Sequence, residues 1–108
     1  MNIKELISIM PGIISVNGNT DTVINLVADD SREVKEGALF VAISGSNHDG
    51  HDFINEAIKR GAKAVIGEKS MDLGDKTYIR VKDSRKALAK TSAWFYGYPG
   101  DKLKIIGV

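Results

Sequence analysis

The segment Ala38-Leu39-Phe40-Val41-Ala42-Ile43-Ser44 decides the fold class. It runs apolar without the polar alternation of a strand that has one wet face. An unbroken apolar strand is typical of burial on both faces of a sheet. Glu36-Gly37 before the segment predicts a turn, and a polar loop from Gly45 to His51 follows it. The segment therefore predicts a buried strand in a sheet that helices cover.

Further strands and helices alternate on either side of this segment. Helices are predicted over Asn2–Ile9, after Asp52 as N-cap, and from Asp83 as N-cap to about Tyr96. Gly61 fits the position just past the second helix, where a left-handed backbone is favoured. Strands are predicted over Ile13–Val16, Val23–Ala28, Ala64–Ile66, Thr77–Val81 and Lys102–Val108. Interleaved strands and helices indicate the α/β class.

Composition excludes several classes of protein. Fifteen Lys and Arg balance fourteen Asp and Glu, for a formal charge of +1, and no basic cluster indicates a nucleic-acid partner. The absence of cysteine excludes disulfides and thiolate chemistry. No apolar run has the length of a signal sequence or of a membrane span. We expect a soluble, cytoplasmic domain that contacts no membrane.

Two polar loops follow predicted strands, and ligands of open α/β sheets bind at the carboxyl ends of strands. The loop Asp29–Arg32 offers a hydroxyl and a guanidinium, and the loop Gly45–His51 offers an amide, two imidazoles and backbone N–H donors. Such groups suit a nucleotide diphosphate. Alternatively, Asp30-Ser31-Arg32 is only a capped turn, with Arg32 paired to Asp29 or Glu33.

The sequence offers neither a metal site nor a catalytic group. His48 and His51 have no third clustered ligand, whereas a closed site needs three or four. No nucleophile–base arrangement is evident, and no GxxxxGK[ST] phosphate loop is present. From the residues alone, the chain is a small α/β domain with a pocket for an anionic ligand.

Several motifs together resemble the Mur ligases, which extend the peptide stem of peptidoglycan precursors. The first motif runs from Asp30 to Ala42, and the second is Gly45 with Asp49-Gly50-His51-Asp52-Phe53. Ala57 with Gly61-Ala62-Lys63-Ala64-Val65, Leu88-Ala89 with Phe95-Tyr96-Gly97-Tyr98-Pro99, and Ile105-Ile106-Gly107-Val108 continue the likeness. The match is closest to ligases that add the third amino acid, diaminopimelate or lysine, to UDP-N-acetylmuramoyl-L-alanyl-D-glutamate.

The resemblance implies a small mixed sheet flanked by helices, cut off before a P-loop ATPase domain. Residues 1–83 would bind the UDP moiety, 84–98 would form a connecting helix, and 99–108 would begin the central domain. The whole ligase would use ATP and Mg²⁺ to activate a carboxylate, and this chain alone would be inactive and bind no cofactor. Its partners would be UDP-N-acetylmuramoyl-dipeptide and the missing central and C-terminal domains.

The resemblance also assigns residues within the predicted pocket. Ser31, Ser46, Asn47, His48 and Asp29 would contact the UDP moiety. Asp30 and Arg32 would hold the first loop in shape.

Two other functions stay open at this point. The chain is also similar to the sister ligase that adds the terminal D-Ala-D-Ala dipeptide, and a stand-alone nucleotide-sugar-binding module is the second alternative. The apolar strand predicted over 102–108 would, if unpaired, favour dimerisation through that strand.

Overall fold

A five-stranded mixed sheet forms the centre of the molecule in the computed structural model, which describes residues 2–10, 12–43 and 50–96. The strands are β1 (Ile13–Asn17), β2 (Leu26–Ala28), β3 (Ala38–Val41), β4 (Ala64–Gly67) and β5 (Thr77–Val81). Their order is β1-β5-β4-β3-β2; β2 to β5 are parallel neighbours, and β1 pairs antiparallel with β5. The mixed sheet expected from the sequence is confirmed.

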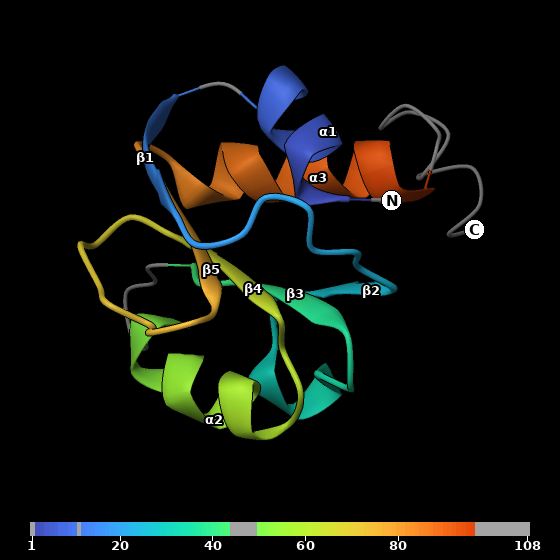
Figure 1. The fold of residues 1–108 in the computed structure, drawn as a ribbon, viewed down its shortest axis with the longest axis vertical. Helices are drawn as coiled ribbons and strands as arrows, with labels where there is room; N and C mark the ends of the chain where they lie inside the picture. The colour runs from blue at the N-terminus through green and yellow to red at the C-terminus, as the bar shows by residue number, and fades with distance from the viewer. Residues whose placement is uncertain (1, 11, 44–49, 97–108) are drawn as a thin grey trace.

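Helices cover both faces of the sheet. Figure 1 shows α1 (Ile3–Ile9) and α3 (Ser84–Tyr96) on one side and α2 (Ile54–Lys59) on the other. Along β3, Leu39 and Val41 pack into the core under α1 and α3, whereas Ala38 and Phe40 pack into the core under α2. All four are buried, so the apolar run without alternation is explained by one core on each side of the sheet.

Two of the helix-end residues predicted from the sequence, Asp83 and Gly61, have the predicted role. The Asp83 carboxylate accepts from the N–H groups of Arg85 and Lys86, at 3.0 and 3.2 Å, which confirms the predicted cap of α3. Gly61 has a φ of +116° past the end of α2, as predicted, and a Cβ there would lie 2.6 Å from the Cα of Glu36.

The predicted N-cap at Asp52 is wrong. A 3₁₀ turn over Gly50–Phe53 leads directly into α2, so the cap position falls on Phe53, which makes no side-chain capping bond.

Two strands are shorter than the sequence predicts. The strand predicted over Val23–Ala28 is limited to β2, because Val23 forms an isolated bridge with Asn2 instead. β3 ends at Val41, and the N–H of Gly50 returns to the carbonyl of Ile43 at 2.8 Å. The strand predicted over 102–108, and pairing between copies through it, lie outside the described residues. No helix in the described ranges has the length and apolar character needed to cross a membrane.

Candidate functional site

The loops after β2 and β3 meet at one edge of the sheet, because the two strands are parallel neighbours. Asp29 and Asp30 follow β2 directly, and a 3₁₀ turn over Ser31–Glu33 comes next. The Ser31 side chain is buried, with 6% of the residue exposed, whereas Asp29 and Arg32 are exposed. The chain thus places a hydroxyl below the surface, between charged neighbours.

Asp30 and Arg32 hold the turn together. Oδ1 of Asp30 accepts from the backbone N–H of Arg32 at 2.9 Å, and the guanidinium lies 2.8 Å from Oδ2. Hydrogen bonds from the Arg32 side chain and backbone lower the pKa of Asp30 from 3.8 to about 2. Arg32 therefore pairs with Asp30, and not with Asp29 or Glu33 as the turn interpretation proposed.

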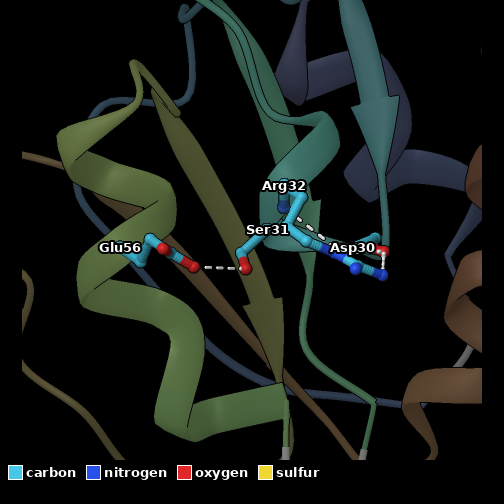
Figure 2. Close-up of polar contacts among 4 residues, drawn as sticks. All are labelled: Asp30, Ser31, Arg32 and Glu56. Carbon is cyan, nitrogen blue, oxygen red and sulfur yellow. Dashed lines mark hydrogen bonds and ion pairs between the residues drawn. The ribbon is translucent and has the colours of Figure 1, made fainter.

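Ser31 makes a contact that spans 25 positions of sequence. Its hydroxyl donates to Oε2 of Glu56, on α2, at 2.6 Å (Figure 2). The other carboxylate oxygen of Glu56 lies 3.8 Å from the guanidinium of Arg60, and the Glu56 side chain is 46% exposed. Figure 2 shows Ser31 pointing toward Glu56, while Asp30 and Arg32 lie on the other side of the turn. The Ser31–Glu56 bond joins the β2 loop to α2.

These side chains line a cleft of about 740 Å³, which we call the Ser31 cleft. This volume is in the range of small-molecule sites. The lining residues are Asp29, Asp30, Ser31, Arg32, Phe40, Ile43, Gly50, Phe53 and Glu56.

The structure brings four of the predicted site residues, Asp29–Arg32, to the Ser31 cleft. Ser46, Asn47 and His48, the other three predicted contacts, lie outside the described residues. Sequence reasoning missed Phe53 and Glu56. Phe53 is 40% exposed despite its apolar ring, but its position in the apolar pattern of α2 does not distinguish it from core residues.

His51, one of the two imidazoles of the second loop, is not among the residues that line the Ser31 cleft. The residue is buried, and its Nε2 accepts from the backbone N–H groups of Glu68 and Lys69 at 2.8 and 3.2 Å. The imidazole thus supports the loop after β4. Within residues 2–10, 12–43 and 50–96, no three His, Cys, Asp or Glu side chains are grouped as a metal site would require.

Charge in the cleft bears on the kind of ligand that fits. Its lining contains the carboxylates of Asp29, Asp30 and Glu56 but one guanidinium, that of Arg32, which is paired with Asp30. Carboxylates repel phosphate oxygens and accept from N–H and O–H donors. The described part of the cleft is therefore suited to an uncharged group that carries N–H or O–H donors, and it contains no arrangement of nucleophile and base.

Comparison with known proteins identifies one family. The profile described as "Mur ligase family, catalytic domain" matches residues 23–96. The chain is 42% identical to a UDP-N-acetylmuramoyl-L-alanyl-D-glutamate–2,6-diaminopimelate ligase from Cytophaga hutchinsonii and 43% identical to one from Clostridium tetani. Each match covers 100% of this chain and 23% of the relative, so the chain spans about a quarter of the length of these ligases.

A solved structure has the same fold. It is the UDP-N-acetylmuramoylalanyl-D-glutamyl-2,6-diaminopimelate–D-alanyl-D-alanyl ligase from Acinetobacter baumannii, which superposes with a TM-score of 0.72 at 26% identity. The match covers 85% of this chain and 20% of that one.

Proposed function

The chain belongs to the Mur ligase family, and from this premise we propose that it is the domain that holds the UDP moiety of a peptidoglycan precursor. The proposed ligase adds a third amino acid, diaminopimelate or lysine, to UDP-N-acetylmuramoyl-L-alanyl-D-glutamate. The Ser31 cleft carries the proposal, because it lies at the carboxyl ends of parallel strands and offers acceptors beside apolar and aromatic side chains. Relatives named for this reaction support the choice of substrate.

Within the proposed site, Ser31 and Glu56 supply acceptors for the uridine end of the ligand. Phe53 and Ile43 line the same cleft with apolar surface, against which a flat base can pack. Asp29 is proposed as a further contact, and Asp30 with Arg32 as the pair that shapes the loop. Ser46, Asn47 and His48 stay proposed contacts from the second loop.

The chemical step is assigned to no residue of this chain. The described residues have no cluster of carboxylates or histidines that would fit Mg²⁺, and the sequence has no GxxxxGK[ST] loop for ATP. We propose that ATP and Mg²⁺ act in a central domain of a ligase of the relatives' length, in the cytoplasm, where the nucleotide precursor and ATP are available. Residues 1–83 would form the UDP domain, 84–98 a connecting helix, and 99–108 the first strand of that central domain.

The contribution of this chain to catalysis would be positional. Binding energy from a part of the substrate that does not react can hold the reacting carboxylate in place at a distant site. A ligand anchored by its uridine end loses translational and rotational freedom before the chemical step, which favours the reaction of the other end.

Calorimetric titration of the 108-residue chain with three ligands tests the proposal. UDP and UDP-N-acetylmuramoyl-dipeptide should bind, whereas N-acetylmuramoyl-dipeptide without UDP should not. Ser31→Ala should weaken both interactions, and Ser8→Ala, at an exposed position of α1, should leave them unchanged. Binding of the peptide without UDP, or of none of the three ligands at millimolar concentration, would contradict the proposal.

The sister ligase that adds the D-Ala-D-Ala dipeptide is the less favoured candidate, because the structure named for that activity is 26% identical to this chain, whereas the relatives named for the first activity are 42% and 43% identical. Both candidates require UDP in the cleft and differ in the peptide that is extended. An activity assay of a protein that contains this chain, with UDP-N-acetylmuramoyl-dipeptide and -tripeptide as alternative acceptors, separates them. Extension of the dipeptide substrate supports the first candidate, and extension of the tripeptide substrate supports the second.

A further inference from the structure

We propose that Glu56 is a specificity-determining residue, which holds the single proton of the Ser31 hydroxyl and so makes Ser31 an acceptor toward the ligand. An acceptor at this position selects a ligand with a donor, the N3–H of uracil, over cytosine, whose N3 is itself an acceptor. The inference rests on the proposed function, and it extends that function by naming the residue that distinguishes a uridine from a cytidine nucleotide.

Ser31 and Glu56 share a single hydroxyl proton. A serine hydroxyl has one proton to donate and two lone pairs that accept, whereas an ionised carboxylate only accepts. Oγ of Ser31 lies 2.6 Å from Oε2 of Glu56, so the proton of this bond belongs to Ser31. Hydrogen bonds from a hydroxyl to a carboxylate are short and about twice as strong as neutral ones. A ligand in the cleft therefore meets Ser31 with its proton already engaged.

The surroundings of Ser31 make rotation of its hydroxyl away from Glu56 unfavourable. Ser31 is buried, and Glu56 approaches from α2, which is fixed to the sheet by the buried Ile54 and Ala57. If Ser31 turned to donate to a ligand, Glu56 would lose a charge-assisted bond. Re-orientation of the hydroxyl would thus give up a charge-assisted bond, which is stronger than a bond between neutral groups. The cleft keeps Ser31 as an acceptor unless Glu56 is removed.

The other carboxylates of the cleft are acceptors as well. The carboxylates of Asp29 and Glu56 accept hydrogen bonds, and the guanidinium of Arg32 is held by Asp30. Phosphate oxygens carry no protons for such acceptors, but the imide N–H of uracil and the ribose hydroxyls do. Of these donors, we assign N3–H to Ser31, because Ile43 and Phe53 give this cleft the apolar lining that a base requires and a sugar does not.

A site that pairs with a donor rejects an analogue that lacks it, because its own polar group is then left unpaired. We expect the wild-type chain to bind UDP about tenfold more tightly than CDP, the ratio that one hydrogen bond of ordinary strength gives. Glu56→Ala frees the Ser31 proton, which can then be donated to N3 of cytosine. The preference should fall to within about threefold in this variant.

The test is a calorimetric titration of UDP and CDP into the wild-type chain, Glu56→Ala, Ser31→Ala and the control Glu33→Ala. Glu33 is an exposed carboxylate of the same turn and does not line the cleft, so its loss should leave the tenfold preference. Ser31→Ala should lose the preference by weakening UDP alone. Far-UV circular dichroism and thermal melting establish that each variant is folded.

A ligand change tests the same point without any substitution in the protein. N3-methyl-UDP lacks the donor, and the wild-type chain should bind it about as weakly as CDP. Equal binding of UDP and N3-methyl-UDP overturns the inference, as does a tenfold preference retained by Glu56→Ala; the proposed function survives both results, because UDP still binds. Failure of the wild-type chain to bind any of these nucleotides overturns the proposed function, and this inference with it.

Discussion

Two groups of polar side chains lie at the carboxyl ends of parallel strands, one in the Ser31 cleft after β2 and β3 and the other after β4 and β5. The second group, which we call the Glu68 network, comprises His51, Glu68, Arg80 and Ser84. The Glu68 carboxylate accepts from the N–H and the hydroxyl of Ser84 at 2.8 and 2.9 Å, and Nε of Arg80 donates to the Glu68 carbonyl at 2.9 Å. His51 accepts from two backbone N–H groups of the same loop.

The two groups contain similar residue types but use them differently. In the Glu68 network, hydrogen bonds join side chains to the backbone and to the start of α3, so the polar atoms serve the fold. In the Ser31 cleft, Ser31 and Glu56 bond to each other and line a cavity of about 740 Å³. Residue type alone therefore does not identify a binding site. A site is indicated where polar residues line a cavity, and not where their hydrogen bonds are used within the fold.

The largest expected effect comes from His51→Ala, in the Glu68 network. Two backbone N–H groups would lose their acceptor and a buried ring would be deleted, so the free energy of unfolding should fall by about 1–3 kcal/mol. Urea denaturation measures this loss, and Asp52→Ala, an exposed neighbour, should change stability by less than about 0.5 kcal/mol. A stable His51→Ala chain that no longer binds UDP would contradict the separation of the two groups, because the Glu68 network would then belong to the binding site.

Ser31→Ala should lower the affinity for UDP and have a smaller effect on stability. The affinity for UDP should fall about tenfold, which corresponds to about 1.4 kcal/mol, because the hydroxyl proposed to accept a hydrogen bond from the ligand is removed. Stability should fall by less than the loss expected for His51→Ala, since Glu56 is 46% exposed and water can replace the hydroxyl. Calorimetry and urea denaturation on the same sample give both numbers. Unchanged affinity combined with a large loss of stability would place Ser31 among the structural residues.

Ser84→Ala tests a second side chain of the Glu68 network. The variant loses the hydroxyl bond to Glu68 but keeps the backbone N–H bond to the same oxygen. The free energy of unfolding should therefore fall by about 1 kcal/mol, less than for His51→Ala, with no change in UDP affinity. Denaturation curves and titrations test both expectations, and a drop in UDP affinity would count against the separation of the two groups.

The smallest effect concerns pH at the rim of the cleft. The pKa of Asp30 is lowered from 3.8 to about 2 in the folded chain, chiefly by the hydrogen bond from the Arg32 side chain. A lowered folded-state pKa contributes stability that is present above the unfolded value and lost as the pH falls from about 4 to about 2. The contribution is small, because the pair is exposed and screened by solvent. Carbon NMR of the Asp30 carboxyl should show a midpoint near 2, and Arg32→Ala should move it toward 3.8; a wild-type midpoint near 3.8 would contradict the pairing.

The core was predictable from sequence because its signals are local. The run Ala38–Ile43 carries its own evidence of burial on both faces, and the Asp83 cap depends on residues two and three positions away. The cap predicted at Asp52 is wrong, since a 3₁₀ turn over Gly50–Phe53 replaces the expected start of α2. Periodicity and capping therefore indicate where helices and strands lie. They do not predict the 3₁₀ turns that precede a helix and shift its first residue.

The candidate site was predictable in part for the same reason. The position of Asp29–Arg32 after a strand marked the loop, and parallel pairing of β2 with β3 brings it to the sheet edge. Glu56 was not predictable, because its partner Ser31 is 25 residues away and Glu56 has the pattern of an ordinary exposed helix position. The role of His51 could not be read from its loop either, because its Nε2 accepts from the backbone N–H of Glu68, 17 residues away.

The central claim is that the Ser31 cleft, and not the Glu68 network, receives the UDP moiety. Amide NMR of the labelled 108-residue chain, titrated with UDP, tests this claim residue by residue. Our account predicts progressive shifts at Ser31, Arg32, Gly50, Phe53 and Glu56, which Ser31→Ala weakens, and none at Glu68 or Ser84. Shifts centred on Glu68 and Ser84, or no shifts at millimolar UDP, would contradict it.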